Sequence, residues 1–79
     1  MRARILAPVE RQLARCLERP GQEALPSLRV VIVLGDEGDV QVVSTTPTES
    51  ATCVEPHIRS RTWPRTRRGR EVLVHVVRR

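Results

Sequence analysis

The first part of the chain has apolar residues at helical spacing. Residues on one side of a helix recur every three or four positions, and the set that follows this rule is Ile5, Val9, Leu13, Cys16 and Leu17. The segment Arg19-Pro20-Gly21 then interrupts the pattern with residues that end helices. The sequence therefore predicts a first helix that carries Cys16 on its apolar side.

Two short apolar runs follow and are joined by a turn. Residues 28–34 are apolar except for Arg29, which is typical of a strand buried on both faces or lying in the middle of a sheet. Residues 35–39 (Gly-Asp-Glu-Gly-Asp) favour a turn, and the β-branched run 40–46 resumes extended structure. Together these segments predict a β-hairpin.

The rest of the chain predicts a second helix and a third strand. Residues 46–50 have the composition of a helix start, and the positions on one helical face are Cys53, Val54, His57, Ile58 and Arg61. Because Pro56 lies among them, we expect this helix to be short or kinked. Trp63-Pro64 ends it, with Trp63 expected to fill the core, and residues 71–77 predict a strand.

The order helix–strand–strand–helix–strand predicts a two-layer α+β fold. A right-handed crossover through the second helix would place the third strand beside the first. The sheet then has three strands in the order 2-1-3, all antiparallel, with the two helices on one face. We expect residues 1–79 to form a single domain, cut from a larger protein.

Composition makes the two cysteines important. The 79-residue chain has one Trp and neither Phe nor Tyr, and a domain this small buries only about 60% of its unfolded surface. A disulfide between Cys16 and Cys53 would stabilise such a domain by roughly 4 kcal/mol through loop entropy. Two reduced thiols are the alternative, and in both cases the apolar positions predict that the two side chains are buried. A disulfide would indicate an oxidising compartment.

Charge is distributed unevenly along the chain. Residues 1–56 contain 6 Arg and 8 acidic residues, a net charge of −2, whereas residues 57–79 contain 8 Arg and one acidic residue, a net charge of +7. The second region includes a basic patch formed by Arg59, Arg61, Arg65, Arg67, Arg68 and Arg70. Guanidinium groups match phosphates, so a small cytosolic nucleic-acid-binding protein is an alternative hypothesis. The chain offers one aromatic residue for base stacking and no nucleic-acid-binding motif.

The sequence does not indicate an enzyme or a metal site. Cys53 and His57 are one helical turn apart, but the paired Cys-x2-Cys spacing of structural zinc sites is missing. Covalent catalysis would also need an orienting group and an oxyanion site. We predict no catalytic residues, no metal and no cofactor. In the last strand, His75 alternates with Leu73 and Val77 and is expected to border solvent.

Taken in order, several features resemble the TonB C-terminal domain superfamily. They are the helix with Cys16, the hairpin with Gly38-Asp-Val40, the helix with Cys53-Val54, the Trp63-Pro64 pair, and a basic loop with Gly69 before the final strand. The chain is most similar to the cysteine-containing version at the C-termini of gliding-motility-associated proteins (the AgmX type). There the second helix carries Cys-Val before a Phe-Pro pair, whose position Trp63-Pro64 occupies here.

The resemblance implies a non-enzymatic periplasmic module of an inner-membrane-anchored protein, with a protein partner in the envelope or outer membrane. In the superfamily, a partner peptide pairs with the open edge of the last strand, and sheet order 2-1-3 leaves that strand at an edge. The expected docking residues are Val72, Leu73, Val74, His75, Val76 and Val77. No apolar run reaches the length of a signal peptide or a membrane span, so we expect no membrane insertion by this segment. A cytoplasmic location is the alternative if the 79 residues are the whole product.

Overall fold

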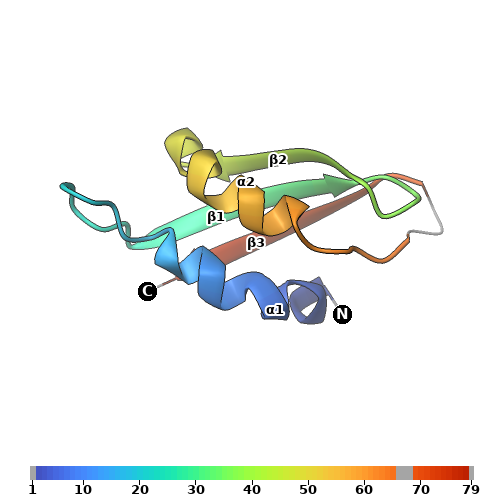
Figure 1. The fold of residues 1–79 in the computed structure, drawn as a ribbon, viewed down its shortest axis with the longest axis horizontal. Coiled ribbons are helices and arrows are strands. Elements are labelled where there is room, and N and C mark those ends of the chain that lie inside the picture. The colour runs from blue at the N-terminus through green and yellow to red at the C-terminus, as the bar shows by residue number, and fades with distance from the viewer. Residues whose placement is uncertain (1, 66–68, 79) are drawn as a thin grey trace.

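The computed structural model describes residues 2–65 and 69–78, with side chains from Val9 onward. Its elements follow the predicted order, with a short 3-10 helix added before the second helix (Figure 1). In chain order they are α1 (Arg2–Arg15), β1 (Ser27–Leu34), β2 (Val40–Thr46), η1 (Thr48–Ser50), α2 (Ala51–Arg59) and β3 (Glu71–Arg78). Cys16, predicted within the first helix, follows directly after the end of α1.

The three strands form one antiparallel sheet in the order β2-β1-β3, which confirms the predicted topology. In this register Val31 of β1 lies opposite Ser44 of β2 and Val74 of β3. Burial alternates along β1, and the buried row consists of Leu28, Val30, Ile32 and Leu34. The intervening Val31 and Val33 are half-buried. The apolar run in β1 thus reflects a central position in a sheet with one covered face.

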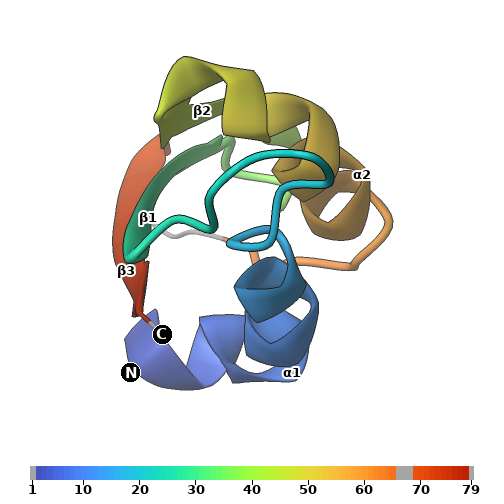
Figure 2. The same ribbon diagram turned by 90° about the vertical axis from the view of Figure 1, so that its left-hand side faces the viewer.

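Both helices cover the same face of the sheet (Figure 2). α1 packs beside β3, α2 packs beside β2, and the two helices contact each other. The core between helices and sheet is aliphatic apart from Cys16 and Trp63. Burying one Val, Leu or Ile side chain contributes roughly 1.5–3 kcal/mol, so this layer supplies the main driving force for folding. Among the described helices, none is long and apolar enough to cross a membrane.

α2 and the segment after it close one end of the core. α2 contains Pro56 but runs only from Ala51 to Arg59, and the missing N–H of one proline removes a single intrahelical hydrogen bond. Beyond the helix, Trp63 is 5% exposed and its indole Nε1 donates to the Ile58 carbonyl at 2.9 Å, which confirms its place in the core. The Trp63 carbonyl lies against Gly38, where φ is 81° and a Cβ would collide with that oxygen. Glycine is therefore required at this turn.

Candidate functional site

β3 forms one edge of the sheet. It pairs along its length with β1, from Leu34 opposite Glu71 to Ser27 opposite Arg78. Among the described residues, no strand pairs with its other side. In an antiparallel strand, alternate residues direct their N–H and C=O groups away from the partner strand. This side of β3 therefore carries groups that a further strand could pair with, and all the predicted docking residues, 72–77, lie within it.

The side chains of β3 alternate between two rows, as predicted. Leu73 and Val77 are buried beneath the helices, and His75 between them is half-buried. The other row faces away from the helices, and its members Val72, Val74 and Val76 are between 41% and 46% exposed. A strand added beside β3 would meet exposed apolar side chains on the outer face, since Leu73 and Val77 of the inner row are already covered.

The outer row of β3 belongs to a larger apolar surface on the open face of the sheet. Val33 of β1 lies between Val42 of β2 and Val72, and Val31 lies beside Val74. We call this surface the valine face, consisting of Val31, Val33, Val42, Val72, Val74 and Val76. Contiguous exposed apolar surface marks interaction sites on soluble domains. Its β1 and β2 members were not among the predicted site residues, because they can be recognised only when strand register is combined with side-chain alternation.

His75 connects the inner row of β3 to α1. Its Nε2 lies 3.5 Å from Glu10 Oε1, within ion-pair distance, and the side chains of His75 and Glu10 are 20% and 55% exposed. The position of His75 at the border of solvent agrees with its predicted place. The same Nε2 is buried without a hydrogen bond, as is Oε1 of Gln12 on α1. His75 and Glu10 therefore form a polar pair where α1 rests on β3.

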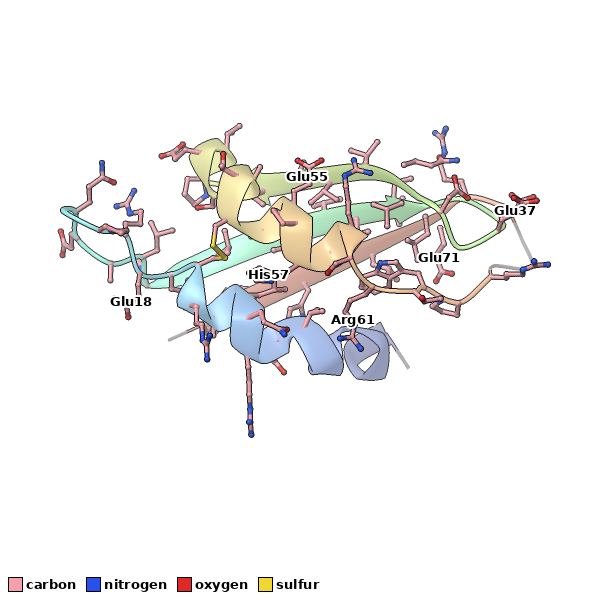
Figure 3. The ribbon with its side chains drawn as sticks, viewed as in Figure 1. Glu18, Glu37, Glu55, His57, Arg61 and Glu71 are labelled. Atoms are coloured by element: carbon pink, nitrogen blue, oxygen red, sulfur yellow. A yellow bond between two sulfur atoms is a disulfide. The ribbon has the colours of Figure 1, made fainter. Side chains whose placement is uncertain are left out.

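β2 forms the other edge of the sheet, and arginines from the predicted basic patch contact it. Arg59 Nη1 donates to the Val40 carbonyl at 3.1 Å, while its Nε bonds Glu55 Oε1 at 2.7 Å. Arg70 Nε donates to Gln41 Oε1 at 3.1 Å. Figure 3 shows Glu55 on α2, on the side that faces β2. These two arginines therefore bind groups within the domain.

The other arginines of the predicted patch are either exposed or outside the described residues. Arg61 and Arg65 are exposed in the segment after α2, whereas Arg67 and Arg68 lie outside the described residues. The structure thus places four members of the patch, Arg59, Arg61, Arg65 and Arg70, and two of these four are engaged at β2. Charge counting along the sequence could not reveal these contacts, because they arise only when α2 and the segment before β3 fold onto β2.

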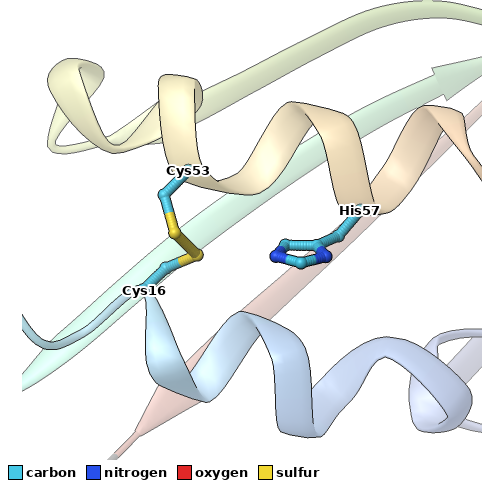
Figure 4. A group of neighbouring side chains, drawn as sticks. All are labelled: Cys16, Cys53 and His57. Carbon is cyan, nitrogen blue, oxygen red and sulfur yellow. A yellow bond between two sulfur atoms is a disulfide. The ribbon is translucent and has the colours of Figure 1, made fainter.

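A disulfide joins the segment directly after α1 to α2. Cys16 and Cys53 are bonded at an S–S distance of 2.02 Å, with their Cα atoms 5.8 Å apart. Cys16 is 2% exposed, but Cys53 is exposed, so the predicted burial of Cys53 is wrong. Val54 and Ile58 form the row of α2 that faces the sheet, while Cys53 and His57 form the adjacent row toward α1 (Figure 4). This disulfide is compatible with an oxidising compartment.

The fold and site define a small disulfide-bridged α+β domain with an open sheet edge and an open apolar face. Comparison with family models, curated proteins and solved structures found no match for the chain. The features of this chain that bear on function are therefore the geometry of β3, the valine face and the disulfide between the helical layers.

Proposed function

We propose that this domain is a non-enzymatic protein-interaction module that docks an extended partner segment by strand addition at β3. The observation that carries the proposal is the position of β3 at the edge of the sheet order β2-β1-β3. Strand addition draws affinity from main-chain hydrogen bonds and specificity from alternate side chains. The proposal also fits the resemblance to the TonB C-terminal superfamily, whose members use the same strand.

The two rows of β3 indicate the chemistry of the partner segment. Alternate partner side chains would extend the valine face next to Val72, Val74 and Val76, which favours β-branched or other apolar residues at those positions. The intervening partner side chains would point toward α1, where His75 and Glu10 lie. We expect an extended segment with apolar residues at every second position.

The proposed setting is the bacterial periplasm, with the domain belonging to a TonB-like protein anchored in the inner membrane. The disulfide supports this setting because such bonds persist in oxidising compartments. The partner would then be a protein component of the envelope or of the outer membrane.

A proline scan of residues 72–76 tests the docking edge. Proline removes an N–H, and it is tolerated in an edge strand where that N–H points away from the sheet. We expect one alternate set of variants to fold and the other to unfold, because the second set loses hydrogen bonds to β1. Binding of peptides selected on the wild-type domain from a random display library is measured for the folded variants. Loss of binding is expected, and retained binding in a folded outward-pointing variant would contradict strand addition at β3.

The second candidate function is binding of a polyanion such as nucleic acid. The exposed guanidinium groups of Arg61 and Arg65, in a region of net charge +7, favour it. Contacts with phosphates release counterions, so such binding weakens steeply with salt. A titration of DNA and RNA at increasing salt separates the two candidates. Weak binding without salt dependence at about 50 mM salt excludes the nucleic-acid function.

A further inference from the structure

Three side chains that are common metal ligands meet where the helices are bridged. Cys16 Sγ, Cys53 Sγ and an imidazole nitrogen of His57 all lie within 4.8 Å of one another (Figure 4). Two of them come from one turn of α2, because residues four apart on a helix are neighbours on its surface. The third comes from the segment directly after α1. The three ligand atoms therefore lie together in one place, between the end of α1 and α2.

We propose that the reduced form of the domain binds one zinc ion through Cys16, Cys53 and His57. In the oxidised form the sulfur atoms are bonded to each other, and only free thiolates are effective zinc ligands. The disulfide therefore controls the site, with oxidation closing it and reduction opening it. This inference is independent of docking at β3.

The positions of the ligands suit a tetrahedral ion. With Zn–S bonds of about 2.3 Å and Zn–N bonds of about 2.0 Å, tetrahedral geometry places the two sulfur atoms roughly 3.8 Å apart and each about 3.5 Å from the nitrogen. In the disulfide the two sulfur atoms are 2.02 Å apart, with their Cα atoms 5.8 Å apart, and each sulfur lies within 4.8 Å of an imidazole nitrogen. Coordination therefore requires the S–S bond to break and the sulfur atoms to move roughly 1.8 Å further apart by side-chain rotation. Three protein ligands leave the fourth position for water, as in many zinc sites with an open coordination position.

The site is also reachable from solvent. A surface hollow of about 470 Å³ lies between residues 16–22, after α1, and residues 49–53, at the start of α2, and both cysteines line it. Cys53 is itself exposed, and His57 is half-buried beside it. A reductant or an ion can therefore approach the sulfur atoms through this hollow, although Cys16 is buried.

A phosphine can serve as the reductant that opens the Cys16–Cys53 disulfide. The phosphine takes oxygen from water to become a phosphine oxide, and the two electrons and two protons convert the disulfide into two thiols. Binding of the zinc ion then releases the two thiol protons as the thiolates coordinate. The bound ion replaces the covalent link between the helices with a coordination link at the same point.

The test uses Co²⁺ as a coloured substitute for zinc, added to the whole domain with and without prior reduction by a water-soluble phosphine. The reduced wild-type domain is expected to bind one equivalent, with the intense visible bands of four-coordinate thiolate-bound Co²⁺, and to release it when Zn²⁺ is added. The oxidised domain is expected to show no such bands. Their absence from the reduced domain, or their presence in the oxidised domain, would overturn the proposal.

Two histidine variants separate the proposed site from binding by the thiols alone. His57→Ala is expected to weaken Co²⁺ binding by at least roughly 100-fold, since loss of a residue that only supports a ligand already costs about 10- to 100-fold. His75→Gln, which changes the other histidine, is expected to leave the affinity unchanged. Equal affinity of His57→Ala and wild type contradicts the site.

If reduction unfolds the domain, the circular dichroism spectrum provides the readout of refolding. One equivalent of Zn²⁺ is then expected to restore the folded spectrum of the wild-type chain, because metal binding and folding are coupled in such systems. The same addition should fail to restore His57→Ala. A reduced wild-type chain that stays unfolded with Zn²⁺ overturns the proposal.

Discussion

The two edge strands of the sheet, β2 and β3, differ in what lies beside them. The 3-10 helix η1 and α2 pack against β2, and Arg59 and Arg70 donate to its first two residues, Val40 and Gln41. β3 has α1 against one face and an exposed row of valines on the other. Charged side chains and covering elements are the usual means by which proteins block an open edge. The chain thus places two of its own arginines at β2, while β3 is the edge proposed for docking.

The composition of the two strands reinforces this difference. The exposed residues of β2 are Gln41, Val42, Ser44 and Thr46, whereas those of β3 are Val72, Val74, Val76 and Arg78. Valine is well suited to a pleated, half-buried surface. A second sheet or strand would therefore gain more apolar contact at β3 than at β2, and the variants below test how far this asymmetry extends.

The largest effect is expected from removal of the disulfide, which ties α1 on the β3 side to α2 on the β2 side. The bridge spans 37 residues in sequence, and loop entropy assigns it about 4 kcal/mol. Cys16→Ala combined with Cys53→Ser should lower the free energy of unfolding by that amount in a urea titration. Because loop entropy acts on the unfolded state, amides that exchange only by global unfolding should lose this protection in all three strands. An additional loss is expected in α1, which contacts β3 and α2, and an equal loss in α1 and β2 would contradict it.

A pair of alanine variants compares the two rows of β3. Leu73 is 1% exposed and Val74 is 46% exposed. Leu73→Ala should destabilise the domain by about 2–5 kcal/mol through lost burial and the resulting cavity. Val74→Ala, one residue away, should change stability by less than about 0.5 kcal/mol. Thermal unfolding of both variants measures the difference, and a large cost at Val74 would indicate that the valine face is already covered, for example by self-association.

Much of this architecture could be predicted because it depends on local patterns. The apolar run of β1, the turn at residues 35–39 and the chain order determine a sheet with β1 in the centre, and the structure has that order. The exposure of Cys53 could not be predicted in the same way. Cys53 and His57 form one row of α2, Val54 and Ile58 form the next, and both rows fit an apolar stripe of ordinary width. The packing of α1 against α2 determines which row faces the sheet.

In the basic patch, the contacts of the charged residues likewise could not be predicted from local sequence patterns. Arg59 and Arg61 are two residues apart and equivalent by composition, yet only Arg59 reaches the Val40 carbonyl. A long arginine side chain takes its partner from whatever element folds next to it. The local sequence therefore identified the charges, whereas the distinction between a structural arginine and an available one required the fold.

The smallest effect is expected from Arg59→Ala, which tests whether the protection of β2 depends on that arginine. The Arg59 and Glu55 side chains are 45% and 41% exposed, so their ion pair contributes little, and the hydrogen bond to Val40 adds a modest amount. The free energy of unfolding should fall by no more than about 1 kcal/mol. Arg61→Ala is the matched control, since Arg61 is an exposed arginine beyond the end of α2.

The decisive readout is peptide binding in a chain that combines Arg59→Ala with a non-binding proline substitution in β3. Binding should remain absent, because the exposed row of β2 contains one valine, Val42, beside Ser44 and Thr46, and so offers a partner fewer apolar contacts than the row of β3. Its return would mean that Arg59 keeps a second docking edge closed.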